Sequence, residues 1–274
     1  ILKIKKFFMN NLDLYCVTNK RVKFIENTKI NLAWVGLEEK PRDYLECDNK
    51  VNIFYKEKYY SELTFQYWYW KNMLDIKKNN WIGFCQKRRF WTMSNVSNES
   101  INHNNIGKNL LLEIPIEFNE YNAIICKPIS VSGVKTMKLI KRGWKNLIKS
   151  PSILFDKKKK NLALHFDMHH GYGYLDIAIE QMQQKDKEEF RDFVDSQNTF
   201  NPHIMFIAKP DIVNEWFKTL FPWLERCEKI IGFKNLKGYD TTRLYAYLAE
   251  RYLSFWFKKY TNYKEHSWIE LKHF

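Results

Sequence analysis

The chain has 274 residues, of which 45% are hydrophobic and 17% aromatic, and this composition excludes an intrinsically disordered protein. Its 45 Lys and Arg residues against 31 Asp and Glu residues give a formal net charge of +14. A surplus of that size indicates an anionic partner, such as a nucleic acid, an anionic lipid surface or a phosphorylated substrate. An AT-rich genome would give the same excess of Lys and Asn without any function, so the distribution of the charge is more informative than its sum.

The cysteines and the apolar runs narrow the cellular setting. Five cysteines stand far apart and form no CxxC motif, which argues against both a disulfide framework and a zinc site. Reduced thiols in a cytoplasmic protein are the expectation. No apolar run approaches the ~18 residues that a membrane-spanning helix needs.

A first buried strand is predicted at Leu12–Val17. It is followed by Thr18, Asn19 and Lys20, polar residues of the kind that end the first strand of many nucleotide-binding α/β domains. Neither GxGxxG nor GxxxxGKS/T occurs in the sequence, which argues against a Rossmann dinucleotide site and against a P-loop.

The stretch 61–91 combines a dense group of aromatic residues with a basic cluster. Its first half predicts a helix that Ser61 caps, with Glu62 in the first turn, where the helix dipole favours an acid. Trp68 and Tyr69 lie off the apolar face of this helix and are candidates for contact with a ligand. Four residues at i, i+4, i+7 and i+11 predict the buried face: Leu63, Tyr67, Trp70 and Leu74.

The second half of this stretch predicts a buried strand at Trp81–Cys85, which runs into the polar residues 86–89 (QKRR). In open α/β sheets ligands bind at the carboxyl ends of the strands, so this basic end is a candidate binding site. Adjacent residues on a strand point to opposite faces, so at most one of Arg88 and Arg89 can face the site. The other is expected to pair with Glu62 or another acid.

The remaining pattern predicts an α/β protein with a mixed sheet flanked by helices and a C-terminal helical portion. Further strands are predicted at 31–37, 121–126 and 203–208, and helices at 175–194, 210–231 and 240–260. The segment 167–174 is predicted as a polar loop. No repeat or flexible linker divides the chain, so residues 1–274 are expected to form one domain, with the sheet in about 12–130 and a mainly helical part in about 134–274.

Residues 134–160 predict an amphipathic helix with basic side chains on one side and Gly143 as a weak point. Two interpretations stay open. A basic amphipathic helix that contains Trp can lie on an anionic membrane surface, or the helix packs on the domain with its lysines merely solvated. The apolar side consists of Val134, Met137, Ile140, Trp144, Leu147 and Ile148.

These motifs together resemble a family of uncharacterised capsular-polysaccharide glycosyltransferase domains. The family carries ELTxxYWxWKN followed by IGxxHYRRYF, and this chain has ELTFQYWYWKN and then IGFCQKRRFW. The strand that ends in VTNK resembles the first strand of the family, the segment 205–207 its NMFI strand, and the segment 243–253 its closing RxxGFLxERL helix. His170 followed by Leu175 and Asp176 resembles its His-x4-Leu-Asp pattern. The resemblance spans about residues 12–257.

The resemblance implies a GT-A-like nucleotide-sugar fold and transfer of a sugar, carried by UDP, to a growing capsular polysaccharide or lipo-oligosaccharide. The implied partners are a nucleotide-sugar donor and a glycan or glycolipid acceptor, with no nucleic acid. The implied setting is the cytoplasm, with peripheral contact of 134–160 with the inner membrane as an option. The donor-binding candidates are Thr18, Asn19, Lys20, Glu62, Gln66, Lys87, Arg88 and Arg89. The acceptor-binding candidates are Trp68, Tyr69, His203, Asp240 and Arg243.

Two ways of holding a donor diphosphate stay open. Metal-dependent enzymes of this fold bind Mn or Mg through Asp-x-Asp, a motif that the sequence lacks, so a divalent cation would need scattered ligands such as Asp167, His169 or His170. The favoured alternative is direct contact through the basic strand end 87–89, because Arg offers bidentate donors to phosphate oxygens.

The candidates for the general base that takes the acceptor proton are His170, Asp167 and Asp176, which lie near the predicted loop. Adjacent histidines beside a glycine are as often a solvent-exposed turn. Asp240 has a competing interpretation as a helix cap.

Departures from the family pattern bear on mechanism. The His-Tyr that precedes the double Arg in the family is Gln86-Lys87 here, so any catalytic role of that His is lost. This suggests an alternative to an active glycosyltransferase, namely a catalytically inactive scaffold of a glycan assembly complex. A nucleic-acid-binding module is a further alternative, against which the dispersed basic residues and the lack of an RNP-like or zinc-finger motif count. Glu250 and Arg251 are predicted to form a packing ion pair.

Overall fold

The computed structural model describes residues 11–93, 101–133, 136–156 and 159–271. Within these ranges the chain folds around an eight-stranded mixed sheet. Its central strand is β3 (Trp81–Gln86), all of whose residues are buried. On one side of β3 lie β1 (Leu12–Thr18) and then β2 (Asn31–Trp34), each parallel to its neighbour.

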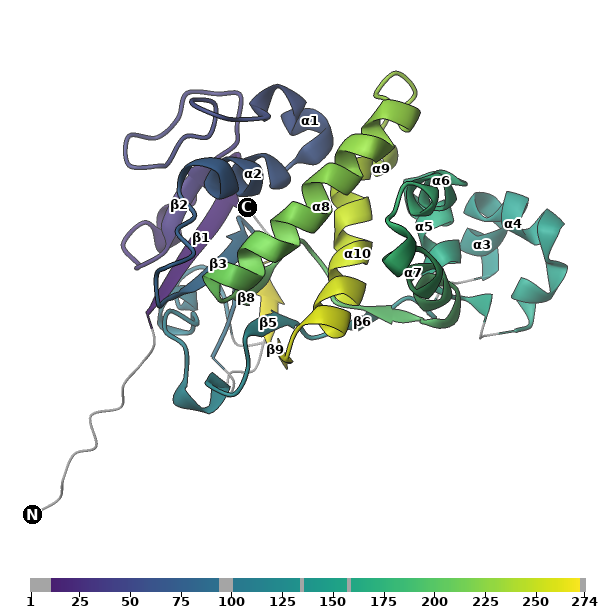
Figure 1. The fold of residues 1–274 in the computed structure, drawn as a ribbon. Coiled ribbons are helices and arrows are strands. Elements are labelled where there is room, and N and C mark those ends of the chain that lie inside the picture. The colour runs from purple at the N-terminus through teal and green to yellow at the C-terminus, as the bar shows by residue number, and fades with distance from the viewer. Residues whose placement is uncertain (1–10, 94–100, 134–135, 157–158, 272–274) are drawn as a thin grey trace, which may run out of the picture.

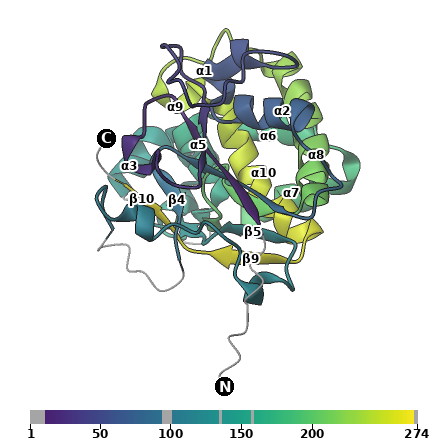
Figure 2. The same ribbon diagram turned by 90° about the vertical axis from the view of Figure 1, so that its left-hand side faces the viewer.

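On the other side of β3 the strand directions alternate. There β8 (Phe206–Ala208) is antiparallel to β3, β5 (Ala123–Cys126) is antiparallel to β8, and β9 (Tyr263–His266) is parallel to β5. The short strand β4 (Arg89–Trp91) forms a hairpin with β3, and β10 (Trp268–Glu270) pairs with β4. Figure 2 shows β4 and β10 at one side of the molecule and β5 and β9 below helix α10.

The structure confirms the predicted mixed sheet flanked by helices, because each of the five predicted strands overlaps an observed one. Strands β4, β9 and β10 were not predicted, since each has at most four residues and carries polar side chains. Three of the eight strands, β8, β9 and β10, come from the second half of the chain. A separate two-stranded ribbon joins β6 (Ile129–Ser130) to β7 (Thr199–Phe200).

Four helices pack near the sheet, and α8 and α10 lie between the sheet and the group of helices α3 to α7 (Figure 1). They are α1 (Glu57–Tyr60), α2 (Leu63–Asn72), α8 (Pro210–Ile231) and α10 (Leu244–Tyr260), of which α8 has the predicted bounds. The short helix α9 (Tyr239–Thr242) precedes α10. Single 3-10 turns occur at η1 (Lys23–Ile25), η2 (Phe54–Lys56), η4 (Ile106–Lys108), η5 (Ile116–Phe118) and η6 (Pro151–Leu154).

The predicted loop at 167–174 is wrong in its first half. Residues up to His170 belong to helix α5 (Leu162–His170), which Asn161 caps by accepting a hydrogen bond from Leu164 N at 2.9 Å. The helix predicted at 175–194 is two helices, α6 (Tyr174–Glu180) and α7 (Gln184–Ser196). The Asn cap explains the early start of α5, because it satisfies one of the free N–H groups of the first turn.

The single amphipathic helix predicted from residue 134 onward is also two helices, α3 (Thr136–Arg142) and α4 (Trp144–Lys149). Gly143 separates them and packs against Leu139, where an added Cβ atom would lie 2.9 Å from the Leu139 carbonyl oxygen. Val134, which the prediction placed on this helix, lies outside the described residues.

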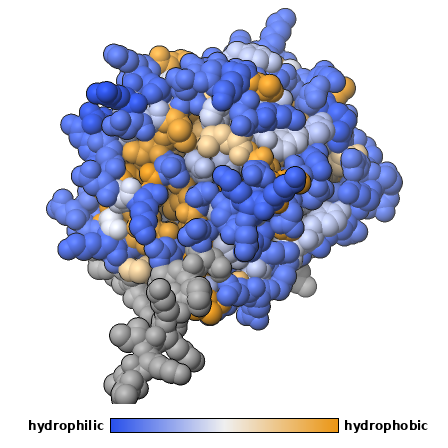
Figure 3. All heavy atoms as spheres, turned by 60° about the vertical axis from the view of Figure 1, so that its left-hand side comes forward, coloured by the Kyte–Doolittle hydropathy of each residue, from blue (hydrophilic) through white to orange (hydrophobic). Residues whose placement is uncertain are grey.

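The sheet is covered on both faces by hydrophobic clusters, and alternate residues of β1, β5 and β8 enter different clusters. From β1, Tyr15 and Val17 pack with residues of α2, α8 and α10. Leu14 and Cys16 pack on the opposite face with residues of the segment 101–118. Most of the face seen in Figure 3 is hydrophilic, with one apolar area surrounded by polar side chains. All five cysteines are buried free thiols.

Gly83 lies in the middle of β3, where side chains of both neighbouring strands cover it. A Cβ atom added there would lie 2.9 Å from Ile207 Cγ1 and 2.9 Å from Leu14 Cδ1. Overpacking of an interior costs about 1–3 kcal/mol, so Gly83→Ala is expected to lower the free energy of unfolding by about that amount in urea denaturation. At Gly133 an added Cβ meets no atom within 4 Å, so Gly133→Ala is the matched control. Equal stabilities of the two variants would contradict this account of β3.

Candidate functional site

The structure brings together the polar residues that follow β1 and β3. The two strands are parallel and in register, with Val17 opposite Gln86, so their carboxyl ends lie side by side. Thr18 fixes the turn after β1, since its Oγ1 donates to the Lys20 carbonyl oxygen at 2.5 Å and accepts from Lys20 N at 3.0 Å. The Lys87 ammonium donates to Asn19 Oδ1 across the two strand ends.

Three charged groups from helices join this strand-end site. Burial lowers the pKa of Lys87, and the charge of Glu62 opposes that change. Burial raises the pKa of Glu57, and the charges of Arg243 and Lys87 oppose that rise. Positive and negative groups are therefore close enough to influence one another while partly shielded from water. We call the following residues the strand-end cluster: Thr18, Asn19, Lys20, Glu57, Glu62, Lys87 and Arg243.

Arg88 and Arg89 are placed differently from the prediction. Lys87 and Arg88 form the turn between β3 and β4, so the strand alternation that would separate the two arginines does not apply. Both guanidinium groups contact Glu270 of β10, at 2.9 Å from Arg88 and 3.2 Å from Arg89. Arg89 also donates to Gln86 Oε1 at 3.0 Å. The double arginine thus ties β10 to the hairpin, and the structure places Lys87 toward Asn19.

Leu63 is fully buried on helix α2 as predicted, and Leu74, just after the helix, is half-buried against the same core. The prediction for Trp68 and Tyr69 is wrong. Trp68 and Tyr69, expected to contact an acceptor, are only 6% and 4% exposed and belong to the main hydrophobic cluster. The Trp68 indole N–H donates to Asn49 Oδ1 at 2.9 Å. Tyr67 and Trp70, expected in the core, are half-buried at the contact with α8. The correction follows from the position of α2 between the sheet and α8, which gives the helix two apolar contact faces.

Gln66 lies below the segment that leads into β8. Its side chain is buried, and its Nε2 donates to the Ile204 carbonyl oxygen at 2.9 Å. Its Oε1 is buried and has no hydrogen-bond partner among the described residues. The hydrogen bond to Ile204 fixes the backbone next to His203, so Gln66 helps to position that residue.

His203 adopts a left-handed backbone conformation with φ 67°. Its backbone N–H donates to Glu250 Oε1 at 2.5 Å, which holds this strained conformation in place. Its ring meets Trp268 edge-on, with centroids 4.6 Å apart. Burial and then the charge of Arg89 lower the pKa of His203 far below its usual range. This imidazole is therefore neutral at physiological pH.

Glu250 and Arg251 form the predicted packing ion pair, with 2.8 Å between Arg251 Nη1 and Glu250 Oε2. The Arg251 side chain is fully buried, stacks on the Phe200 ring at 3.7 Å and contacts His165 Nδ1 at 3.1 Å. A buried guanidinium needs such partners because an uncompensated charge in the interior is strongly unfavourable.

Three histidines on α5 gather beside Arg251 as a histidine cluster of His165, His169 and His170. The rings of His165 and His169 have centroids 4.6 Å apart. Burial, assisted by the charge of Arg251, lowers the pKa of His165 to about 2 and that of His170 to about 3. Burial and the charges of neighbouring cations lower that of His169 to about 4. All three rings are neutral at physiological pH.

The other predicted catalytic residues have separate partners. His170 stacks on Tyr247 at 3.7 Å, and its Nδ1 lies 3.2 Å from the Asp240 carbonyl oxygen. Asp167 accepts hydrogen bonds from Asn146 Nδ2 at 2.7 Å and Gly173 N at 2.9 Å, and burial raises its pKa. The side chain of Asp176 is exposed and pairs with Arg191 at 2.9 Å.

Asp240 does not cap a helix, because Gly238 holds the N-cap position of α9 and the Asp240 carboxylate pairs with Arg142 at 3.1 Å. Within the described part of the chain, no group of three or more His, Cys, Asp and Glu side chains is arranged to hold a metal ion. Asp167, His169 and His170, expected as scattered metal ligands, lie in this part of the chain and form no such group.

Helix α10 connects these polar groups along one face. Arg243, Tyr247 and Glu250 follow one another at i, i+4 and i+7, and they reach the strand-end cluster, His170 and His203 in turn. The polar spacing within an otherwise apolar helix is the sequence signal for this face. The residues that sequence reasoning did not single out are Glu57, His165, Tyr247 and Glu270.

Comparisons with known proteins place the chain in a family. Residues 13–262 match the sequence profile described as Domain of unknown function (DUF4422), so the chain belongs to this family. A comparison with curated proteins finds no match. Among solved structures the chain is similar to the apo structure of the WbbM bifunctional glycosyltransferase, with a TM-score of 0.67 and 18% sequence identity. The similarity covers 96% of this chain and 46% of that chain, so this chain spans about half the length of its structural neighbour. The two share a mixed α/β glycosyltransferase fold.

The histidine cluster makes stability depend on pH. Its folded-state pKa values of about 2, about 4 and about 3 lie below the ordinary value of 6.5, so the unfolded chain binds more protons between these limits. The free energy of unfolding is therefore expected to fall as the pH decreases below about 6.5 and to change little above about pH 7. Each excluded proton contributes at most about 1.4 kcal/mol per pH unit. Urea denaturation at several pH values measures this slope.

His170→Phe isolates one member of the cluster, because Phe keeps a ring to stack on Tyr247 and removes the titrating group. Below pH ~6.5 the free energy of unfolding of this variant is expected to depend less steeply on pH than that of the unmodified chain. The difference corresponds to at most one bound proton. Phe155 lies outside the cluster and does not titrate, so Phe155→Leu is the control and should keep the original slope. An unchanged slope in His170→Phe would count against this assignment.

Proposed function

We propose that this chain is a glycosyltransferase that moves a sugar from a uridine diphosphate donor to a growing surface glycan, either a capsular polysaccharide or a lipo-oligosaccharide. The observation that carries the proposal is the strand-end cluster. It lies at the carboxyl ends of two parallel strands, the position where open α/β sheets bind ligands. The chain shares its fold with a glycosyltransferase. Its sequence motifs resemble those of capsular glycosyltransferase domains.

In this proposal Lys87 and Arg243 bind the donor diphosphate directly. Two cations that face the same site give phosphate oxygens charge-assisted hydrogen bonds. Asn19 holds the Lys87 ammonium in position, and Lys20 adds positive charge at the rim. Arg88 and Arg89 support the diphosphate site indirectly, because both are engaged by Glu270.

We assign the general base to Glu57. Burial raises the pKa of Glu57, which makes its carboxylate a better proton acceptor, and the charges of the proposed diphosphate ligands Arg243 and Lys87 act on it. Asp176 and Asp167 are held by other partners, and the buried imidazole of His170 faces Tyr247 and the Asp240 backbone. Glu57 therefore replaces His170, Asp167 and Asp176 as the proposed base.

The two roles are separable by substitution. Lys87→Met is expected to reduce the stabilisation by UDP, because the diphosphate loses a charged contact, while the free protein keeps its melting temperature. Glu57→Gln is expected to keep the UDP shift and to slow donor hydrolysis by about 10²–10⁴-fold, the usual contribution of a general base. Thermal denaturation with UDP, and UDP release from a panel of UDP-sugars, measure the two effects.

Lys77 lies in the turn that precedes β3, at the opposite end of the strand from the site, so Lys77→Met is the matched control and should retain the UDP shift. Thermal denaturation with UDP is repeated in the presence of Mn²⁺, Mg²⁺ or a chelator. If the basic residues bind the diphosphate directly, the UDP shift is expected to be the same with the chelator as with either metal. No shift with any nucleoside diphosphate would refute the donor assignment. A UDP shift without hydrolysis of any donor would instead favour an inactive scaffold.

We further propose that the protein works in the cytoplasm at the inner membrane surface, with helices α3 and α4 in contact with anionic lipid. Of the helices that the structure describes, none has the length and apolar character needed to cross a bilayer. On α3 and α4, Leu139 is buried and Leu147 is partly buried against α5, which docks the segment to the protein. A row of large apolar side chains on the same segment remains exposed: Met137, Ile140, Trp144, Ile148 and Phe155.

This exposure favours the membrane interpretation over a surface helix with a buried apolar side. Met137, Ile148 and Phe155 are 76%, 72% and 88% exposed. Lysines on the same two helices, among them Lys141, Lys145 and Lys149, are exposed as well. Basic helices with exposed apolar and Trp side chains bind anionic bilayers by combining burial with electrostatic attraction. The segment lies at the end of the molecule farthest from β1 and β2 in Figure 1.

The triple variant Trp144→Ser, Ile148→Ser and Phe155→Ser tests this surface. The intact protein is expected to sediment with phosphatidylglycerol-containing vesicles but not with pure phosphatidylcholine vesicles, and the triple variant with neither, because the inserted apolar area is lost. Ile76 and Ile230 are also exposed but lie outside the segment 137–155 that carries the proposed membrane surface. The double variant Ile76→Ser and Ile230→Ser should sediment with the vesicles as the intact protein does. If the double and triple variants lose vesicle binding equally, the proposed membrane surface is refuted.

A further inference from the structure

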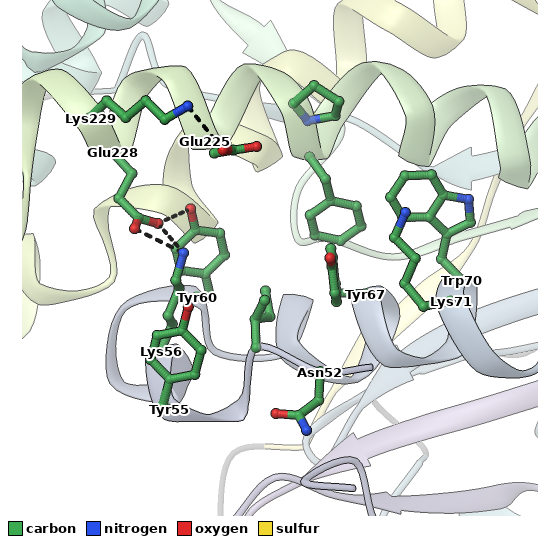
Figure 4. A pocket seen from close by; sticks show the side chains of 13 residues that line it. Asn52, Tyr55, Lys56, Tyr60, Tyr67, Trp70, Lys71, Glu225, Glu228 and Lys229 are labelled. Atoms are coloured by element: carbon green, nitrogen blue, oxygen red, sulfur yellow. Dashed lines mark hydrogen bonds and ion pairs between the residues drawn. The ribbon is translucent and has the colours of Figure 1, made fainter. Parts of the chain in front are cut away.

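A cavity of about 450 Å³ opens between α8 and the segment that runs from η2 into α2 (Figure 4). Ligand sites in proteins are commonly about 300–1,000 Å³ and combine aromatic walls with a few polar groups. This cavity is not part of the strand-end cluster. None of the seven residues of that cluster lines it.

The walls of the cavity are built from aromatic rings. Trp70 stacks on Phe221 with centroids 5.7 Å apart, and Tyr67 meets the same Phe221 ring edge-on at 5.0 Å. Tyr55 lies at the rim and is 78% exposed. Its large apolar ring is therefore in contact with water, where it is available to a ligand. Rings fixed by mutual packing give flat surfaces that a ligand meets with little loss of side-chain entropy.

Four of the five charged groups that line the cavity are paired with one another, and the fifth, Lys71, lies over the Trp70 ring with its Nζ 3.3 Å from the ring centroid. Glu228 accepts from Lys56 Nζ at 2.7 Å and from Tyr60 Oη at 2.8 Å, and Lys229 pairs with Glu225 at 3.0 Å. These paired groups still offer hydrogen-bond donors and acceptors to hydroxyl groups. Such a lining suits an uncharged, hydroxyl-rich ligand better than a phosphate or a nucleotide.

The cavity and the strand-end cluster share one structural element. Tyr55, Lys56 and Tyr60 face the cavity. Glu57, in the middle of the same turn, interacts with Lys87 and Arg243. The segment ends at Ser61, which has a positive φ of 52° that is uncommon for a residue other than glycine. A ligand in the cavity would therefore hold the short helix that carries Glu57.

We infer that this cavity is a glycan-binding site that holds neutral sugar units of the acceptor chain, away from the site of transfer. The inference rests on the proposed glycosyl transfer to a glycan. The carbon–hydrogen face of a pyranose ring packs on the exposed Tyr55 ring, and the sugar hydroxyls bond to the paired charges that line the cavity. Acceptor chains long enough to fill the cavity would also contact the segment that continues into α1, the helix that carries Glu57.

Tyr55→Ala tests the site, because Tyr55 is exposed and its loss leaves the fold intact. Binding of galacto-, manno- and gluco-oligosaccharides of two to six units is measured by saturation-transfer NMR and by quenching of Trp fluorescence. At least one series is expected to bind the intact protein, with affinity that rises with length, and Tyr55→Ala is expected to bind about 10-fold more weakly. Phe155→Ala removes another exposed aromatic ring outside the cavity and should bind like the intact protein.

The outcomes separate this inference from the proposed function. If no oligosaccharide binds, or if Tyr55→Ala binds as tightly as the intact protein, the glycan site is refuted, whatever the response to UDP. If UDP fails to stabilise the protein while oligosaccharides bind through Tyr55, the glycan site stands and the donor assignment falls. Tight binding of UDP alone at this cavity, shown by loss of the UDP shift in Tyr55→Ala, would overturn the neutral-ligand assignment.

Discussion

The buried ion pair between Glu250 and Arg251 is the interaction on which the polar half of the molecule depends. Arg251 is fully buried, so its charge must be balanced inside the protein, and Glu250, His165 and the Phe200 ring provide that balance. Glu250 in turn accepts the backbone hydrogen bond that keeps His203 in its left-handed conformation. One pair of adjacent residues on α10 thereby fixes groups from α5 and from the approach to β8.

The strand-end cluster depends on a different constraint, the parallel pairing of β1 and β3. Their common direction puts Asn19 and Lys87 at the same edge of the sheet, although 68 residues separate them in the chain. Helix α1 then adds Glu57, and the start of α10 adds Arg243. The mixture of signs matters for the proposed chemistry, because cations suit a diphosphate while a carboxylate of raised pKa suits proton removal.

Helices α1 and α2 separate two surfaces with different properties. On one side lies the charged strand-end cluster, and on the other lies the aromatic cavity against α8. Tyr67 and Trp70 take part in the cavity because α2 is packed between two layers, so no face of the helix is simply core or solvent. An elongated acceptor that reaches from one surface toward the other is consistent with this arrangement.

The sequence by itself determined the mixed α/β class, the five main strands, helix α8 and the candidate residues Asn19, Lys20 and Lys87 at the strand ends, because apolar periodicity and strand-end polarity are local properties. It did not determine that Trp68 and Tyr69 of α2 are buried, that Arg88 and Arg89 share Glu270, or that Glu57 joins the site. Those features depend on contacts between segments far apart in the chain, and a single sequence read by local pattern carries no record of which distant segment packs against which. Only the tertiary structure decided them.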